Sequence, residues 1–267
     1  MAHLAIRGGT PVRTEPFHPW PVYDDRDKQA LIRELEAGQW GIGSPSIDAF
    51  EKRFAEFCQA RYAVACTNGT DAITIALQAL GVGAGDEVII PPYTFMATAV
   101  AVLMANAIPV FADIDPGTYN IDPRSAAEKI TPRTKAIIPV HIAGNPADMD
   151  GVLALAKKHN LRVLEDAAQA HGAAWKGRRV GALGDCGTFS FQSSKNLACG
   201  EGGATVTDSE ELAEKLRSFT NCGRVRHGLW YEHHEVAGNH RLGGFQAALL
   251  LVGLERVEEQ MKRREEN

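Results

Sequence analysis

Hydrophobic positions along the chain follow two spacings that alternate from residue 62 onward. Short runs rich in Val, Ile and Ala are typical of buried strands, and longer stretches with apolar residues every three or four positions are typical of helices. The expected strands are 62–66, 87–90, 109–112, 135–140, 162–165, 188–191 and 204–207. The expected helices are 25–37, 71–80, 96–105, 148–159 and 209–221. This alternation predicts an α/β fold with a mainly parallel sheet between layers of helices.

Segments outside this alternation complete the predicted organisation. A further helix, with Ser46 as its expected N-cap, places Phe50, Phe54 and Phe57 on one face. Four prolines at positions 11, 16, 19 and 21 favour an extended N-terminal arm over a helix. The expected units are an arm at 1–24, a large α/β domain at 25–244 and a long helix at 245–267.

Composition and charge are those of an ordinary soluble globular protein. Of the 267 residues, 45% are hydrophobic and 23% are charged, and the net charge is -5. This charge gives no electrostatic reason to expect nucleic acid or an anionic membrane as a partner. No apolar stretch is long enough to span a bilayer and no secretory signal is evident, so we expect a cytoplasmic protein. The five cysteines form no Cys-x-x-Cys pair and are expected to be reduced thiols.

A histidine-rich stretch at 223–240 raises the question of a metal site. It contains His227, His233, His234 and His240, without the cysteine or carboxylate spacing of a zinc site. We therefore expect no metal here. A long loop, functional or mobile, is the interpretation that fits the stretch.

Residues that could bind a ligand or take part in catalysis follow several of the expected strands. Gly69 and Thr70 follow the first strand, Phe95 follows the second, Asp166 follows the strand 162–165, and Lys195 follows the strand 188–191. Ligands of open α/β sheets bind beyond the carboxyl ends of the strands. These residues are therefore expected to meet at one site.

Each of these residues also has an ordinary structural interpretation. Lys195 alone would be a surface charge, Asp166 a helix N-cap, and Phe95 or its neighbour Tyr93 a core aromatic. The pair Gly69-Thr70 is also a common way to begin a helix. Together, however, they match what pyridoxal 5′-phosphate (PLP) requires. PLP needs a lysine for an imine, a carboxylate for the pyridine nitrogen, an aromatic face and an anion-binding turn.

Several short motifs, in a fixed order, are more specific than any single residue. They are TNGTDA at 67–72, VIIPPYTF at 88–95, DID at 113–115, PVH at 139–141, EDAAQAHG at 165–172, SF at 190–191 with KN at 195–196, and GEGG at 200–203. With these motifs the chain resembles the DegT/DnrJ/EryC1/StrS family of PLP-dependent aminotransferases from about residue 9 to 267. The resemblance implies the large domain of fold type I, the aspartate aminotransferase-like fold. It also implies that 245–267 begins the link to a smaller C-terminal domain, which this sequence does not include.

The resemblance assigns a role to individual residues. Lys195 would form the Schiff base with PLP and move the proton at the substrate carbon, and Asp166 would pair with the pyridine nitrogen. The other residues implied to bind the cofactor are Gly69, Thr70 and Ser190 at the phosphate, Phe95 on the ring, Gln169 near the 3-hydroxyl and Asn239. Asn239 would reach the phosphate in the neighbouring subunit, which implies a homodimer with shared active sites.

The implied activity is transfer of an amino group from L-glutamate or L-glutamine to a keto-sugar or keto-cyclitol by a ping-pong mechanism. Family relatives that act as sugar dehydratases have histidine at the lysine position, so Lys195 favours amino transfer. Within the family, the stretches 16–25 and 189–192 are more similar to the branch of keto-inositol aminotransferases and aminohydroxybenzoate synthases than to the nucleotide-sugar enzymes. Two alternatives stay open: a PLP-binding or regulatory protein without turnover, and PLP-dependent dehydration or aromatisation of a cyclic ketone.

Overall fold

The computed structural model describes residues 3–226 and 228–266, in which strands and helices alternate as the hydrophobic pattern predicts. The helices are α1 (Asp25–Ala37), α2 (Pro45–Phe57), α3 (Gly69–Ala79), α4 (Ala97–Met104), α5 (Pro123–Glu128), α6 (Met149–His159), α7 (Glu210–Thr220) and α8 (Gly244–Glu265). The strands are β1 (Tyr62–Cys66), β2 (Glu87–Ile90), β3 (Ile108–Phe111), β4 (Thr134–Ile137), β5 (Arg162–Asp166), β6 (Ala174–Trp175), β7 (Arg178–Arg179), β8 (Cys186–Ser190) and β9 (Gly203–Thr207). The expected helices and strands are present with small shifts at their ends, whereas α5 and the β6–β7 pair were not predicted.

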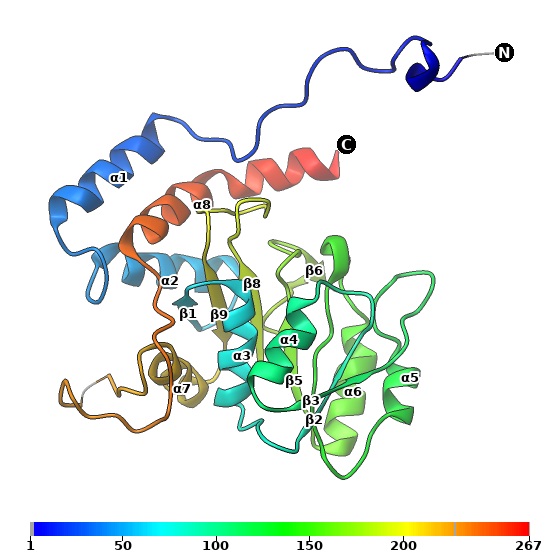
Figure 1. Cartoon of the computed structure of the whole chain (residues 1–267), viewed down its shortest axis with the longest axis vertical. Helices are drawn as coiled ribbons and strands as arrows, with labels where there is room; N and C mark the ends of the chain where they lie inside the picture. The colour runs from blue at the N-terminus through cyan, green and yellow to red at the C-terminus, as the bar shows by residue number, and fades with distance from the viewer. Residues whose placement is uncertain (1–2, 227, 267) are drawn as a thin grey trace.

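Seven of the strands form one sheet in the order β1-β9-β8-β5-β4-β2-β3. Strand β9 runs antiparallel to both of its neighbours, and the other neighbouring pairs are parallel. The prediction of a mainly parallel sheet is therefore confirmed. Figure 1 shows the sheet in the middle of the molecule with helices on both sides.

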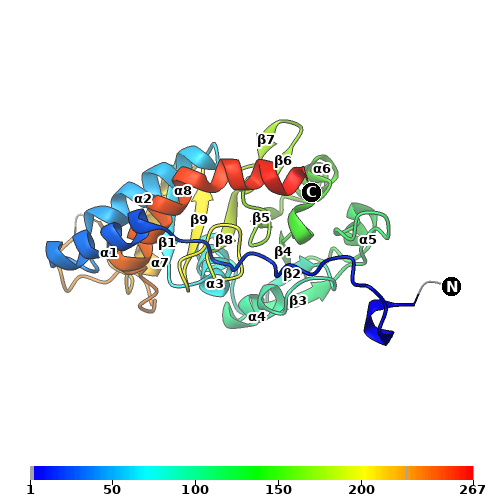
Figure 2. The ribbon, with the colours of Figure 1, turned by 90° about the horizontal axis from the view of Figure 1, so that it is seen from above.

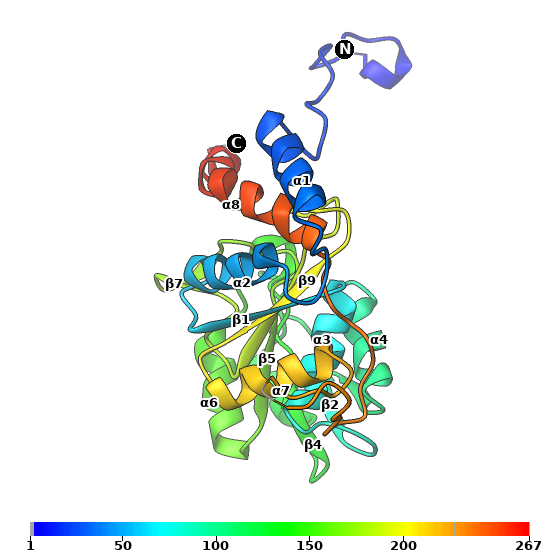
Figure 3. The same ribbon diagram turned by 90° about the vertical axis from the view of Figure 1, so that its left-hand side faces the viewer.

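The sheet divides the helices into two layers (Figure 3). Helices α3, α4 and α7 pack on one face, and α2 and α6 pack on the other, with α8 against α2. Strand β1 illustrates the division, because Val64 and Cys66 join the core on the α3 side and Ala63 and Ala65 join the core on the α2 side. A mainly parallel sheet is expected to be buried on both faces in this way.

An aromatic cluster fills the core between α2 and the sheet. Phe50 and Phe54 from α2 meet Phe189 and Phe191, and the ring centroids of Phe54 and Phe191 lie 5.1 Å apart in an edge-to-face arrangement. All four side chains are fully buried. Edge-to-face contacts of this kind add to the free energy gained by burying the rings. The predicted apolar face of α2 is confirmed at Phe50 and Phe54.

The N-cap of α2 differs from the prediction. Ser44, not Ser46, is the cap, and its Oγ accepts a hydrogen bond from the Ser46 amide at 3.3 Å. Pro45 occupies the first helical position, where its missing N–H has no consequence because no partner is needed there. The Ser46 hydroxyl instead donates to buried Glu34 of α1 at 2.5 Å. Ser46 therefore joins two helices rather than starting one.

The terminal segments of the described chain lie on the α2 side. Helices α1, α2 and α8 lie side by side, as Figure 2 shows from above. The arm before α1 passes α8, where Arg264 lies over the Trp20 ring, before it extends away from the helices. It contains no helix or strand apart from a 3-10 turn at Ala5–Arg7 that the prediction of an extended arm missed. No helix in 3–226 or 228–266 has the length and apolar character needed to cross a membrane.

Candidate active site

A cavity of about 810 Å³ opens at the carboxyl ends of the central strands. Seven of the eight residues expected to bind the cofactor line it: Gly69, Thr70, Phe95, Asp166, Gln169, Ser190 and Lys195. They come from the last residues of β5 and β8 and from the segments that follow β1, β2, β5 and β8, far apart in the sequence. The structure thus brings these residues together where an open α/β sheet binds its ligands. Their individual roles remain predictions.

Asp166 is the last residue of β5 and is buried, with 5% of its surface exposed. Its Oδ2 accepts a hydrogen bond from the Thr98 hydroxyl at 2.7 Å, and its Oδ1 accepts one from the Ala168 amide at 3.2 Å. Burial raises the pKa of this carboxyl above its ordinary value, while these two donors and the charge of Lys195 lower it. The N-cap interpretation of Asp166 is wrong, because a turn rather than a helix follows it.

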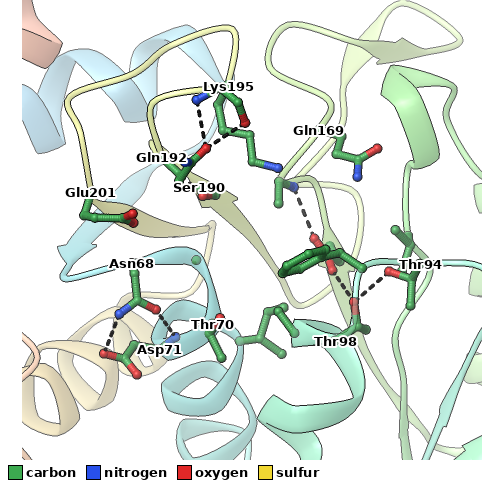
Figure 4. A pocket seen from close by; sticks show the side chains of 18 residues that line it. Asn68, Thr70, Asp71, Thr94, Thr98, Gln169, Ser190, Gln192, Lys195 and Glu201 are labelled. Carbon is green, nitrogen blue, oxygen red and sulfur yellow. Dashed lines mark hydrogen bonds between the residues drawn. The ribbon is translucent and has the colours of Figure 1, made fainter.

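Lys195 lies in the loop after β8 and is half-buried. Its side chain extends into the cavity between Ser190 and Gln169 (Figure 4). Its ammonium group forms no ion pair within the part of the chain that the structure describes. A cation held this way, facing a cavity that also contains a buried carboxylate, is not an ordinary surface lysine.

A turn suited to an anion lies between β1 and α3. Asn68 caps α3 by accepting a hydrogen bond from the Asp71 amide at 2.8 Å, so Gly69 and Thr70 form the first turn at the positive end of the helix dipole. Ser190 packs directly against this turn, since a Cβ added at Gly69 would lie only 2.7 Å from the Ser190 Cβ. A hydroxyl side chain and helix N-terminal amides therefore meet in one small cradle, a donor set that fits a phosphate.

Phe95 and Gln169 also line the cavity. Phe95 lines the cavity and exposes 71% of its surface, so the interpretation as a core aromatic is wrong for it. Tyr93 is also exposed and pairs with Tyr119 at 5.6 Å between ring centroids, outside the cavity lining. The Oε1 of Gln169 accepts a hydrogen bond from the Ala143 amide at 2.7 Å, which leaves its NH₂ group as the donor available to a ligand oxygen.

Asn239 is the expected residue that the structure does not bring into this cavity. It is exposed, in the segment that returns from the 223–240 loop, where it forms a bridge with Asn221. Within this loop His233 and His234 are exposed, and His240 contacts Asp71 with 3.0 Å between Nδ1 and Oδ2. His227, also named in the metal question, lies outside the described residues.

Several residues of the cavity were not singled out from the sequence. Gln192 shapes the lysine loop, because its Oε1 accepts hydrogen bonds from the amide and the hydroxyl of Ser194 at 2.8 and 2.6 Å (Figure 4). Thr94 and Thr98 link their hydroxyls at 2.8 Å beside Asp166. The sequence gives no periodic signal for this contact, because Thr94 precedes the helix that contains Thr98.

Besides Asp166, the buried polar residue His171 lies close enough to Lys195 to be affected by its charge. His171 is 3% exposed, packs against Phe189 and Phe191, and has no hydrogen-bond partner for either ring nitrogen among the described residues. Burial, with a smaller contribution from the charge of Lys195, lowers the pKa of His171 to about 3. His171 is therefore neutral at physiological pH.

Comparison with known proteins identifies the family. The model of the DegT/DnrJ/EryC1/StrS aminotransferase family matches residues 22–267. The chain belongs to this family. Its membership explains why the motifs follow one another in a fixed order and why the structure brings them together at one cavity.

Individual relatives agree with this membership. L-glutamine:2-deoxy-scyllo-inosose aminotransferase of Streptoalloteichus tenebrarius is 44% identical over 283 residues, which cover 99% of this chain and 66% of that protein. The crystal structure of 3-amino-5-hydroxybenzoic acid synthase is similar with a TM-score of 0.92 and 44% identity, over 95% of this chain and 67% of that one. The structure of NtdA from Bacillus subtilis with bound cofactor PMP is similar with a TM-score of 0.82 and 36% identity, over 92% of this chain and 57% of that one. The expected aminotransferase fold is confirmed.

The chain spans about 65% of the length of several curated relatives that it matches. The shared part contains the sheet, both helix layers and the cavity. Activity, substrates and partners of the whole protein are therefore matters of proposal.

Proposed function

We propose that this chain binds PLP in the 810 Å³ cavity and transfers an amino group from L-glutamine or L-glutamate to a keto-cyclitol or keto-sugar. The observation that carries the proposal is that Lys195 and the buried carboxylate Asp166 line the same cavity. A lysine that forms an imine and a carboxylate that faces a ring nitrogen are the two groups that PLP chemistry needs most. The family and the names of its relatives support the same reaction class.

The residues of the cavity fit the parts of PLP. The α3 turn at Gly69 and Thr70, with Ser190 against it, would hold the phosphate, and Phe95 would cover one face of the ring. The NH₂ group of Gln169 would donate to the ring hydroxyl. Asp166, with burial opposing its charge, has a physical reason to accept a cationic partner such as a protonated ring nitrogen.

PLP supplies a ring that withdraws electrons from the substrate carbon and carries the amino group between two substrates. The chain supplies the rest. Lys195 holds or moves a proton at Nζ, Asp166 keeps the ring nitrogen protonated, and the Gln192 and Ser194 contacts fix the loop that carries the lysine. These residues orient and move protons on groups whose positions the sheet determines.

The second subunit is part of the proposal. Asn239 is exposed and lies outside the cavity of its own chain, which fits a role at the phosphate of a neighbouring subunit. A homodimer with shared sites would require this exposure. The supporting observation is the placement of Asn239 on the returning segment of a long exposed loop.

Spectroscopy with PLP tests the proposal directly. Purified protein incubated with PLP should show a visible absorbance band that changes on addition of L-glutamine or L-glutamate. Lys195→Ala should lose the band, whereas Lys158→Ala, a change at an exposed lysine of α6, should keep it. Mass spectrometry of products from a panel of keto-inositols and keto-sugars would then identify the acceptor. A spectrum that no amino donor changes would contradict amino transfer.

One other activity has a specific observation in its favour. The similarity to 3-amino-5-hydroxybenzoic acid synthase, with a TM-score of 0.92, makes dehydration or aromatisation of a cyclic ketone the second candidate. The two activities differ in product mass. Amino transfer exchanges the ketone oxygen for nitrogen, whereas dehydration removes water without adding nitrogen. The same product panel therefore separates them.

A further inference from the structure

Thr98 contacts the two parts of the cavity that would meet the cofactor ring at its edge and on its face. The Thr98 hydroxyl donates to Asp166 Oδ2 at 2.7 Å, and the Thr98 amide donates to the Phe95 carbonyl at 3.1 Å. Its side chain is fully buried in the first turn of α4. The side chain and the main chain of one residue therefore restrain both Asp166 and the loop that carries Phe95.

A third group completes this arrangement. Thr94 lies directly before Phe95, and its hydroxyl oxygen is 2.8 Å from that of Thr98 (Figure 4). A hydroxyl has one proton to donate. When Asp166 is ionised, Thr98 gives that proton to the carboxylate, so the Thr94 hydroxyl must be the donor to Thr98. The three groups then form a directed chain from the cavity wall to the carboxylate.

We propose that Thr98 is a positioning residue whose hydroxyl holds the Asp166 carboxylate toward the ring nitrogen of the cofactor. The effect on the cofactor rests on the proposed PLP function. The hydrogen bond between Thr98 and Asp166 is present in the chain without PLP. Its geometry links residues 68 positions apart in the sequence, so local structure does not account for it.

The chemical effect of the hydroxyl follows from its direction. A donor to the charged form of a carboxyl favours that form, and the Thr98 hydroxyl accordingly opposes the effect of burial on the pKa of Asp166. The other groups acting on Asp166 are the Ala168 amide, the charge of Lys195 and the nearby ring of His141. Loss of the hydroxyl should leave Asp166 protonated over a wider pH range and less able to stabilise a cationic ring nitrogen.

Three variants isolate the hydroxyl. Thr98→Val keeps the shape and the amide but removes the donor, and Thr98→Ser keeps the donor. Thr205→Val is the matched control, because Thr205 is also buried but its hydroxyl contacts the Ala72 carbonyl at 3.4 Å, away from Asp166. Removal of one hydrogen bond to a charged group should weaken PLP binding about tenfold or more.

The measurements are the dissociation constant of PLP, its absorbance spectrum as a function of pH, and the stability of the PLP-free protein between pH 4 and pH 8. Thr98→Val should bind PLP about tenfold or more weakly, with a shifted spectrum, and Thr98→Ser should restore most of the affinity. In the PLP-free protein, the stability lost in Thr98→Val relative to wild type should grow as the pH rises, because only the charged carboxylate needs the hydroxyl. Thr205→Val should show a loss that does not depend on pH.

These outcomes separate the inference from the proposed function. If wild type binds no PLP, the proposed function fails, while the pH dependence without PLP still tests the link between Thr98 and Asp166. Affinity, spectrum and pH dependence equal to wild type in Thr98→Val would overturn the inference, as would equal losses in Thr98→Val and Thr205→Val. Should Thr98→Val not fold, Thr94→Val removes the donor to Thr98 and, in the PLP-free protein, should shift the pH dependence of stability in the same direction by a smaller amount.

Discussion

Glu165 and Asp166 are adjacent carboxylates on β5, both buried, with opposite surroundings. Successive residues of a strand point to opposite faces of the sheet, so one side chain enters the cavity and the other enters the interior behind it. The Glu165 side chain accepts hydrogen bonds from three backbone amides, those of Gly181, Leu183 and Gly184, at 2.7 to 2.8 Å. His141 adds a fourth contact, with 3.0 Å from its Nε2 to Glu165 Oε2.

Asp166 receives two hydrogen bonds, from Thr98 and Ala168, and borders the cavity. A buried carboxylate needs several donors or a cation to balance the loss of hydration. Glu165 obtains all of its donors from the chain and holds the 181–184 segment against the sheet. Asp166 is left with capacity for a further partner. The contrast distinguishes a carboxylate that stabilises the fold from one that is prepared for a ligand.

The largest expected effect is loss of stability in Glu165→Ala. The change leaves three amides without an acceptor, that of Gly181 buried and those of Leu183 and Gly184 partly buried, and an unsatisfied group away from water is destabilising. We expect a loss of about 3–5 kcal/mol in the free energy of unfolding. Urea denaturation of the PLP-free protein measures it. Glu128→Ala, at an exposed position of α5, should change stability by less than about 0.5 kcal/mol.

The second prediction concerns Asp166→Asn, which should act on turnover instead of stability. Asparagine keeps the size and removes a charge that burial disfavours, so the PLP-free protein should be at least as stable as wild type at pH 7. Turnover should fall about 100-fold, equivalent to about 2.7 kcal/mol. Single-turnover kinetics with an amino donor would show it. The contrast between the two carboxylates breaks down if Asp166→Asn unfolds as readily as Glu165→Ala.

Most of the fold could be predicted because the helix and strand periodicities of the chain differ clearly. A buried strand such as 62–66 is a continuous apolar run, and parallel strands place the ends of such runs at the same edge. That is why seven of the residues expected at the site, Lys195 and Asp166 among them, line one cavity. The reversed direction of β9 could not be read from periodicity, because a buried strand has the same pattern in either direction.

The remaining differences arise from contacts between distant segments. The two-residue strands β6 and β7 are too short to show a periodicity, and α5 has six residues. The donors to Glu165 come from main-chain amides 16 to 19 residues away, which no side-chain pattern encodes. Serine is common at helix N-caps, so the sequence predicts Ser46 as one, whereas its contact with Glu34 depends on how α1 packs.

A smaller change is expected at His141, which supports Glu165 alone. The Ala147 amide donates to His141 Nδ1 at 3.1 Å, so Nε2 carries the proton that Glu165 accepts. His141→Ala should cost about 2 kcal/mol of stability, because it removes one of four donors and leaves the Ala147 amide without an acceptor. The measurement is again urea denaturation. A loss as large as that of Glu165→Ala would mean that the histidine, not the three amides, accounts for most of this stabilisation.

The smallest expected effect is a pH dependence that Asp166 adds to the stability of the PLP-free protein. Below the ordinary value of 3.8 the carboxyl is protonated in both folded and unfolded chains and contributes nothing. Because burial raises its pKa in the folded chain, the unfolded chain ionises first as the pH rises, and stability falls from pH 3.8 upward until the pH passes the raised value. Each unit of such a shift corresponds to about 1.4 kcal/mol.

Asp166→Asn should remove this fall of stability with rising pH. Subtracting the free energy of unfolding of wild type from that of the variant at each pH isolates the contribution of Asp166. His171 acts in the opposite direction, because its pKa of about 3 in the folded chain makes stability fall as the pH drops below 6.5. That contribution is the same in both proteins and cancels in the difference. The stability of the variant relative to wild type should therefore increase with pH above 3.8 and then level off. A flat difference curve would show that the donors around Asp166 already offset its burial.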